Sequence, residues 1–281
     1  MLFFDTSICL EVVKKKGNIN RDDWRRLTKY IRHTYRCCVS WVTWKELLVR
    51  LSRGEDQYWE QNREPLRVLR WKRDAVLLEK PPIFTIKHVL GVDAAPKAEL
   101  DGRPAIPLSE QISAVLDAIL VARNKIELKE GVKLPRKNQI IVFDLDHFDL
   151  FESSTRLEYA NLLQGLRDGI IIRSDSTGLS AWILHQCGLT PYTEHCEKLS
   201  SRLDAAYRYH FWLSDQAKNP NYDFHDKRHL GDWDDAQQLF YFCDRRIHML
   251  TLDRNFVDRT EGSPQAPQVL LYSEFVNSLA S

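Results

Sequence analysis

Near its start the chain reads Leu2-Phe3-Phe4-Asp5-Thr6-Ser7, a short apolar run followed at once by three polar residues. Such a run predicts a buried strand, and the Asp-Thr-Ser that follows it predicts the N-terminal cap of a helix. Residues 37–42 repeat the pattern as a second buried strand, after which we expect Thr43 to cap a helix over 44–53. Two strand–helix units in succession favour a parallel sheet with helices on both faces.

The same alternation returns in the C-terminal part of the chain. The spacing of apolar residues predicts a helix over 232–245, a strand over 247–251, a last strand over 268–272 and a closing helix from Glu274. We therefore expect an α/β fold class in which residues 1–54 and 196–281 form three layers around a central parallel sheet.

The middle of the chain, residues 55–195, does not show the same alternation of strands and helices. It contains a charged helical stretch over 56–80, a proline-punctuated passage with one strand at 83–87, and several further helical segments. We expect this region to be a mainly helical insertion into the α/β domain.

Composition narrows the class of protein. With 43% hydrophobic and 28% charged residues in 281, the chain reads as globular. No apolar run approaches the roughly 20 residues that span a bilayer, and the N-terminus has no basic leader, so we expect neither a membrane anchor nor a signal peptide. Six cysteines without a disulfide spacing suit a reducing cytoplasm.

The net charge of +1 conceals an asymmetry, because residues 14–73 hold 17 Lys and Arg against 7 Asp and Glu. One interpretation is a basic surface beside an acidic site, as a nuclease would need for a polyanionic substrate. The alternative is a set of solvated basic helix faces.

Four acids stand where this fold would gather them. Asp5 and Asp253 follow predicted strands, Asp235 lies in the first turn of a helix, and Glu46 is near the start of the helix after the second strand. Functional groups of parallel sheets collect at the carboxyl ends of the strands. Crowded carboxylates repel one another unless a cation neutralises them, and Mg²⁺ or Mn²⁺ suits oxygen ligands. Such a site can hydrolyse a phosphodiester.

The segments that carry these acids resemble the motifs of PIN-domain nucleases. Four stretches carry the resemblance: Phe3-Phe4-Asp5-Thr6-Ser7, Ser40-Trp41-Val42-Thr43-Trp44-Lys45-Glu46-Leu47, Asp235-Ala236, and Leu250-Thr251-Leu252-Asp253-Arg254-Asn255-Phe256. The tail, Val269 to Val276, is similar to the closing strand and helix of that family. The resemblance covers about residues 1–54 and 230–281, and the long middle region departs from it.

The resemblance implies a PIN-like, VapC-like fold and a Mg²⁺- or Mn²⁺-dependent endoribonuclease, with Asp5, Glu46, Asp235 and Asp253 as catalytic metal ligands. RNA is then the expected substrate. A toxin role would add an antitoxin protein as a partner, and a homodimer is a further expectation.

Several neighbours of the acids have two interpretations each. Asp232 is a fifth metal ligand or a helix cap, and Asp234 competes with Asp235 as the third acid. Thr6 and Thr251 are expected to support the site by hydrogen bonds or, for Thr6, to cap a helix. Glu46 is also placed to complete a capping box with Thr43, which would need no metal.

A basic and partly aromatic segment is the candidate nucleic-acid surface: Arg63, Arg67, Arg70 and Trp71. The alternative is a solvated helix face paired with Glu60 and Glu64. Two other functions stay open from the sequence. One is a nucleic-acid-binding or scaffold module with a degenerate PIN fold, and the other is a structure-specific DNA nuclease.

Overall fold

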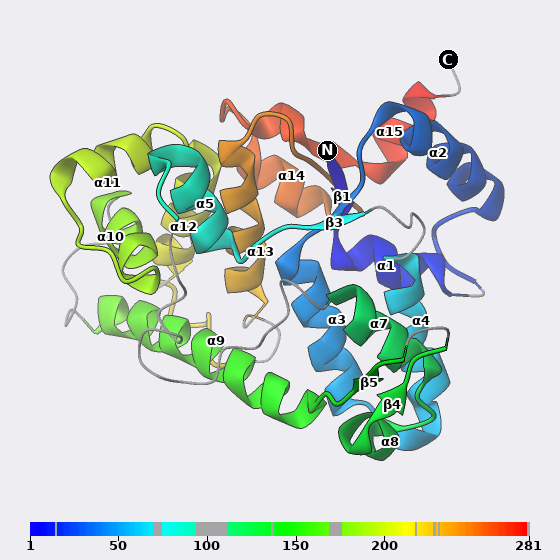
Figure 1. Ribbon diagram of the computed structural model, residues 1–281. Coiled ribbons are helices and arrows are strands. Elements are labelled where there is room, and N and C mark those ends of the chain that lie inside the picture. The colour runs from blue at the N-terminus through cyan, green and yellow to red at the C-terminus, as the bar shows by residue number, and fades with distance from the viewer. Residues whose placement is uncertain are drawn as a thin grey trace.

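A computed structural model describes residues 1–14, 16–69, 75–93, 112–135, 138–168, 176–216, 218–226, 229 and 231–279 (Figure 1). The strands are β1 (Leu2–Phe4), β2 (Cys38–Val39), β3 (Val76–Leu77), β4 (Val132–Lys133), β5 (Ile140–Ile141), β6 (His248–Thr251) and β7 (Val269–Leu271).

The helices up to residue 121 are α1 (Thr6–Val12), α2 (Arg21–Thr34), α3 (Trp41–Arg53), η1 (Asp56–Tyr58), α4 (Trp59–Val68), α5 (Pro81–Leu90) and α7 (Ile112–Val121). The next are α8 (Lys125–Glu130), α9 (Leu145–Arg167), α10 (Ser176–Gln186), α11 (Thr193–Ser200) and α12 (Asp204–Gln216). The last are α13 (Asp232–Gln238), η2 (Leu239–Cys243), α14 (Arg254–Thr260), η3 (Ala266–Gln268) and α15 (Tyr272–Ser278). None of the helices in the described ranges is both long and apolar enough to cross a membrane.

A parallel sheet lies at the centre of the chain's N- and C-terminal parts. Its three hydrogen-bonded strands run in the order β1-β6-β7, with Phe4 opposite Leu250. A parallel bridge between Leu2 and Cys37 places β2 on the free side of β1, and β2 in turn pairs with β3. The chain thus moves away from β1 in one direction and returns on its other side, so the strand sequence reverses between β1 and β6.

Side chains of β1 are buried on both faces of the sheet because helices cover both. Phe3 contacts the rings of Tyr241 and Phe242 in η2, with centroids 5.8 and 6.4 Å away. Phe4 contacts Trp24 of α2 at 5.3 Å. Successive residues of a strand point to opposite faces, so η2 and α2 lie on opposite sides of the sheet.

The second strand is shorter than predicted, and its helix begins earlier. The Ser40 side chain accepts hydrogen bonds from the Val42 and Thr43 amides, so α3 is capped by Ser40 and starts at Trp41. The Thr43 hydroxyl donates to the Phe4 carbonyl at 3.0 Å instead. Glu46 therefore does not complete a capping box with Thr43, and it lies in the second turn of the helix.

The prediction of a strand at 83–87 is wrong, because residues 81–90 form α5. Prolines at its first two positions suit a helix start, and Gly91 ends it in the left-handed region at φ +70°. Phe84 packs edge-on against Tyr241 at 5.1 Å, and Thr85 donates to the Phe240 carbonyl.

The region predicted to be an insertion, residues 55–195, packs closely on the rest of the fold. The strand β3 and helix α5 both lie within 55–195, yet β3 extends the parallel strands and α5 packs on η2. One continuous hydrophobic cluster includes residues of the sheet and of α4, α5, α7 and α9. The structure therefore has an α/β fold with a small parallel sheet and a largely helical middle region, joined by a shared core.

Candidate acidic site

The predicted acids Asp5 and Asp253 lie at the carboxyl ends of adjacent strands. Asp5 follows β1 and caps α1, and its amide donates to the Leu250 carbonyl of β6 at 3.0 Å. Asp253 follows β6 and caps α14 by accepting from the Asn255 amide at 2.9 Å. The strand sequence reverses between these two strands, and such a position is where parallel α/β sheets bind their ligands.

Four donors hold the carboxylate of Asp5. Its Oδ1 accepts from the Thr6 amide at 2.7 Å and from the Gln238 side chain at 3.0 Å. Its Oδ2 accepts from the hydroxyls of Ser7 at 2.6 Å and Thr251 at 2.9 Å. These four hydrogen bonds fix the orientation of the Asp5 side chain.

The hydroxyl of Thr251 connects two of the predicted acids. It donates to Asp5 and accepts from the backbone amide of Asp253 at 3.0 Å. Thr251 is fully buried at the end of β6. Its side chain therefore fixes the relative positions of the residues that follow β1 and β6.

Glu46 reaches the same edge of the sheet from α3. Its carboxylate accepts a hydrogen bond from the hydroxyl of Thr6, the residue next to Asp5. Burial, followed by the charges of Asp234 and Asp5, raises the pKa of Glu46 to about 7, although the Thr6 hydrogen bond and Arg156 oppose the shift. Glu46 is thus close enough to Asp5 for the charge of Asp5 to raise the pKa of Glu46.

Asp235 approaches from the first turn of α13. Its Oδ2 accepts from the Tyr209 hydroxyl of α12 at 3.3 Å. Burial raises the pKa of Asp235 well above its ordinary value, and the next largest causes are the charges of Glu46 and Asp5. Residues about 230 positions apart in the sequence are therefore neighbours in this site.

Asp234 has a separate role. It is fully buried and forms ion pairs with Lys45 of α3 and Arg156 of α9. This cluster of Lys45, Asp234 and Arg156, the buried ion triad, joins three helices beside the acids. Since the carboxylate of Asp234 is taken up by two cations, Asp235 is the better candidate for the third acid.

Asp232 points to a neighbouring pocket. Its Oδ2 accepts from the Tyr222 hydroxyl and contacts the His229 Nδ1 at 3.2 Å. Its charge contributes to the raised pKa of Asp235, so the pocket adjoins the acids. The pocket walls also include Arg156, Tyr159, Leu163, Phe224 and Trp233. We therefore leave Asp232 out of the set of ligands that we propose below.

Within the described parts of the chain, no group of three or more His, Cys, Asp or Glu side chains is arranged as a metal-binding cluster. The carboxylates influence one another electrostatically, but each is held by its own donors: Thr6 for Glu46, Thr251 for Asp5 and Tyr209 for Asp235. The acids of the site are thus neighbours without converging on one point.

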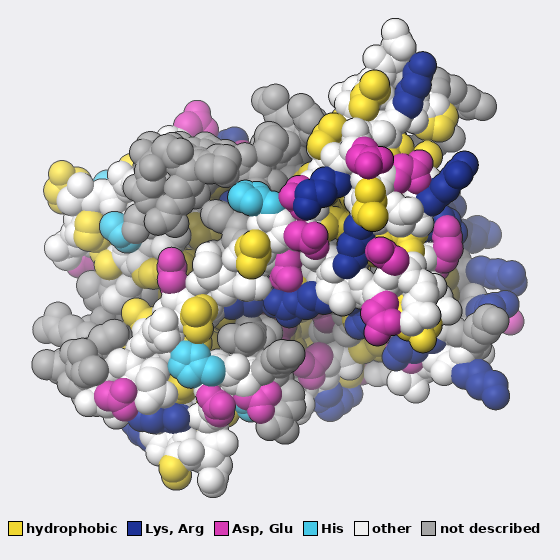
Figure 2. Space-filling model, turned by 90° about the horizontal axis from the view of Figure 1, so that it is seen from below, with side chains coloured by type: hydrophobic (Ala, Val, Ile, Leu, Met, Phe, Trp, Pro, Cys, Tyr) yellow, Lys and Arg dark blue, Asp and Glu magenta, His cyan; other side chains and the backbone are white. Residues whose placement is uncertain are grey.

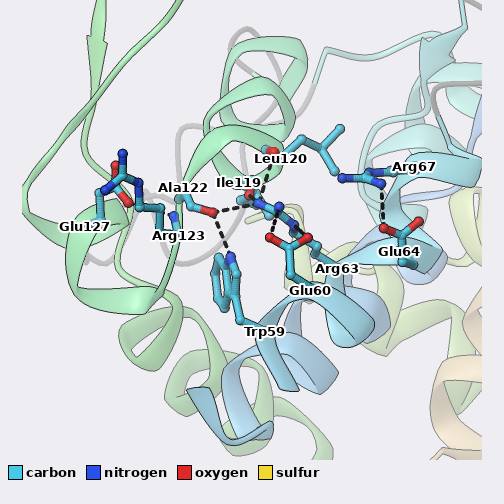
Figure 3. A network of polar contacts seen from close by, with 10 residues as sticks. All are labelled: Trp59, Glu60, Arg63, Glu64, Arg67, Ile119, Leu120, Ala122, Arg123 and Glu127. Atoms are coloured by element: carbon cyan, nitrogen blue, oxygen red, sulfur yellow. Dashed lines mark hydrogen bonds and ion pairs between the residues drawn. The ribbon is translucent and has the colours of Figure 1, made fainter. Parts of the chain in front are cut away.

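The predicted nucleic-acid residues lie elsewhere. Arg63 is 7% exposed, so its place on an exposed basic face is wrong. It binds Glu60 and carbonyls at the end of α7, those of Ile119, Leu120 and Ala122 (Figure 3). Arg67 pairs with Glu64, which agrees with the alternative of a solvated helix face. Arg70 and Trp71 lie outside the described residues.

The surface charges do not form a single basic area on the face in Figure 2. Among the side chains described there, Lys and Arg gather toward the right but alternate with Asp and Glu. Several cations of residues 14–73 are paired with nearby acids, as in the pairs Lys14–Glu11, Arg25–Asp22 and Arg26–Asp23.

Sequence reasoning missed several residues of the site. Gln238 lies three positions after Asp235, a helical spacing that places both on one side of α13, and this was a usable signal. Its Oε1 is buried without a hydrogen-bond partner in the described structure. Tyr209 and Arg156 come from the middle of long helices, where no local motif marks them.

Comparison with protein-family models, with curated proteins and with solved structures gives no match for this chain.

Proposed function

We propose that this chain is a Mg²⁺- or Mn²⁺-dependent nuclease of the PIN type that hydrolyses RNA. The observation that carries the proposal is the mutual effect of Asp5, Glu46 and Asp235. Each comes from a different segment. After burial, the charges of Glu46 and Asp5 raise the pKa of Asp235, and the charge of Asp5, after that of Asp234, raises the pKa of Glu46. A protein gains no stability from such repulsion, which makes a functional reason for it the better explanation.

The side chains suit a hard divalent cation. The proposed ligands are the carboxylates of Asp5, Glu46, Asp235 and Asp253, and all donate oxygen, the atom that Mg²⁺ and Mn²⁺ prefer. The buried and unpartnered Oε1 of Gln238 lies on the residue that holds Asp5. Bound there, the cation would supply positive charge to the scissile phosphate and activate the attacking water.

The chain's own residues prepare this chemistry by orientation. Thr251 and Gln238 hold Asp5, Thr6 holds Glu46, and Tyr209 holds Asp235. Hydrogen bonds of this kind to ligand carboxylates set their direction and commonly change metal affinity 10- to 100-fold when they are removed. Because the pKa of Glu46 is raised to about 7, we expect the affinity of the site for a cation to increase as the pH rises from 5 to about 7.5.

The experiment combines cleavage with metal binding. Purified chain is incubated with end-labelled single-stranded RNA and Mn²⁺, and Mn²⁺ affinity is measured separately by electron paramagnetic resonance. We expect Asp5→Asn and Asp235→Asn to abolish cleavage and weaken Mn²⁺ binding. The matched control is Asp258→Asn, an exposed acid of α14, which should leave both unchanged. Cleavage that persists in both site variants would rule out the assignment.

A nucleic-acid-binding scaffold is the second candidate, and the lack of a converged metal cluster among the described acids favours it. A chain that binds RNA but shows neither Mn²⁺ binding nor cleavage would support this alternative. Parallel reactions with single-stranded DNA and with a flap substrate test the third function, a structure-specific DNA nuclease.

A further inference from the structure

Arg259 is an arginine held rigidly beside the acids. It lies in α14, the helix that Asp253 caps. Its guanidinium carbon is 3.7 Å from the ring centroid of Trp212 and 5.2 Å from that of Tyr209, and its Nη1 donates to the Tyr209 hydroxyl at 2.7 Å. Two aromatic residues of α12 therefore fix the position of this cation.

A single hydroxyl separates Arg259 from the proposed site. Tyr209 accepts from Arg259 and donates to the Oδ2 of Asp235. Both Arg259 and Asp235 influence the pKa of Tyr209, in opposite directions. The guanidinium thus stands at the border of the acids without pairing with any of them.

The other cations near these residues already have carboxylate partners. Lys45 and Arg156 are bound to Asp234, and Arg254 on the same helix is bound to Glu274 at 2.7 Å. Arg259 has no carboxylate partner among the described residues, and it is only partly buried. A guanidinium has five N–H donors, and the single hydrogen bond found for Arg259 uses one of them.

We propose that Arg259 binds a backbone phosphate of the nucleic-acid strand next to the cleaved bond. This inference rests on the proposed function. A polyanion that approaches several carboxylates is repelled, so a fixed cation at their border is needed to hold the strand in place. The planar fork of an arginine matches phosphate oxygens, and the aromatic contacts reduce the entropy lost on binding.

The test measures the salt dependence of RNA binding, which reports how many phosphates are neutralised. The probe is a fluorescein-labelled single-stranded RNA of ten nucleotides, and the parent is the Asp5→Asn chain, which binds without cutting. Fluorescence anisotropy gives the Kd at several salt concentrations. We expect Arg259→Met to weaken binding about 5- to 10-fold and to lower the slope of log Kd against log salt by about 0.7, the value for one single-strand phosphate.

The controls separate a phosphate contact from a structural role. Arg259→Lys should restore most of the slope, because it keeps the charge. Arg254→Met removes a paired arginine of the same helix and should leave the slope unchanged. If the melting curve shows that Arg259→Met does not fold, Arg259→Gln is measured in its place. An unchanged slope in the folded neutral variant overturns the inference.

The outcome is independent of the test for catalysis. A chain that cleaves RNA while Arg259→Met keeps the parent slope retains the proposed function and loses this inference. A chain that does not cleave, with a reduced slope in Arg259→Met, loses the proposed function and keeps Arg259 as a phosphate contact.

Discussion

The hydroxyl of Thr251 takes part in two hydrogen bonds that connect the residues following β1 and β6. Its single oxygen donates to Asp5 and accepts from the amide of Asp253, and it is buried at the end of a central strand. A valine side chain has nearly the same shape but can neither donate nor accept a hydrogen bond. The position therefore separates the effect of hydrogen bonding from the effect of packing.

We expect Thr251→Val to keep the fold and to reduce Mn²⁺ affinity and cleavage about 10- to 100-fold, because Asp5 loses a donor that sets its direction. The melting temperature, the Mn²⁺ titration and the cleavage rate are measured together. Thr251→Ser keeps the hydroxyl and should stay within a few-fold of the parent. Equal losses in the two variants would indicate a packing effect.

The adjacent acids Asp234 and Asp235 should respond oppositely to the same substitution. Asp234→Asn removes the buried carboxylate that forms ion pairs with both Lys45 and Arg156, which we expect to cost about 3–5 kcal/mol in the free energy of unfolding. Asp235→Asn removes a charge that others repel, so the metal-free protein should be at least as stable as the parent. Urea unfolding compares them, and similar stabilities would contradict the buried ion triad.

At the level of elements, Arg63 joins α4 to α7. The guanidinium contacts several carbonyls at the C-terminal end of α7, where such groups have no partner within the helix (Figure 3). The C-terminal end of a helix also favours positive charge. A buried arginine in this position stabilises the packing of two helices and cannot reach a nucleic acid.

We predict that Arg63→Met lowers the free energy of unfolding by about 2–3 kcal/mol, from the loss of charged hydrogen bonds to buried carbonyls. Its affinity for RNA should equal that of the parent. The control is Arg67→Met on the same helix, where a half-exposed pair with Glu64 should contribute about 1 kcal/mol or less. A loss of RNA affinity in folded Arg63→Met would contradict the structural role.

Element predictions succeeded where the pattern was local. The strand 2–4 and the helix after Asp5 follow from one short run, and β6 and β7 were placed to within a residue or two. The strand at 83–87 failed because β-branched and aromatic residues also suit a helix whose apolar face packs on η2. The start of α3 moved to Ser40 because the Thr43 hydroxyl is used by a tertiary contact that no local rule reveals.

At the scale of the whole molecule, we expect the stability of the fold to depend on pH through its buried titratable groups. The pKa of Glu46 is about 7 in the folded chain against an ordinary 4.5. Between these values the unfolded chain releases the proton and the folded chain keeps it, so this group's contribution to stability is lost as the pH rises. The buried His210 has its pKa lowered to about 4 and acts in the opposite direction over part of the same range.

Comparison with Glu46→Gln isolates the carboxyl group. Relative to this variant, we expect the metal-free parent to lose melting temperature between pH 4.5 and about 7, and to stay level above that range. Mn²⁺ should raise the melting temperature of the parent more at pH 7.5 than at pH 5, because binding needs the ionised form. Parallel curves for the two proteins would mean that Glu46 is not perturbed.

The arrangement of the whole fold could be predicted from the sequence only in outline. An α/β class and a helical middle region follow from periodicity, and the acids that follow β1 and β6 were found from strand ends. Across the predicted division at residue 54, Val76 pairs with Cys38 in a parallel ladder and Phe84 packs on Tyr241. Contacts across such distances in sequence depend on the assembled core and leave no mark in a local window.

The pairing of β1 with β6 also sets the order of events during synthesis. Leu2 pairs with His248, so β1 cannot pair with β6 until residue 248 has been synthesised. At about 5–20 residues per second, that delay lasts on the order of 10 seconds or more. Asp5 and Asp253 cannot meet before then. A nascent chain therefore carries no assembled acidic centre near the messenger RNA from which it is being translated.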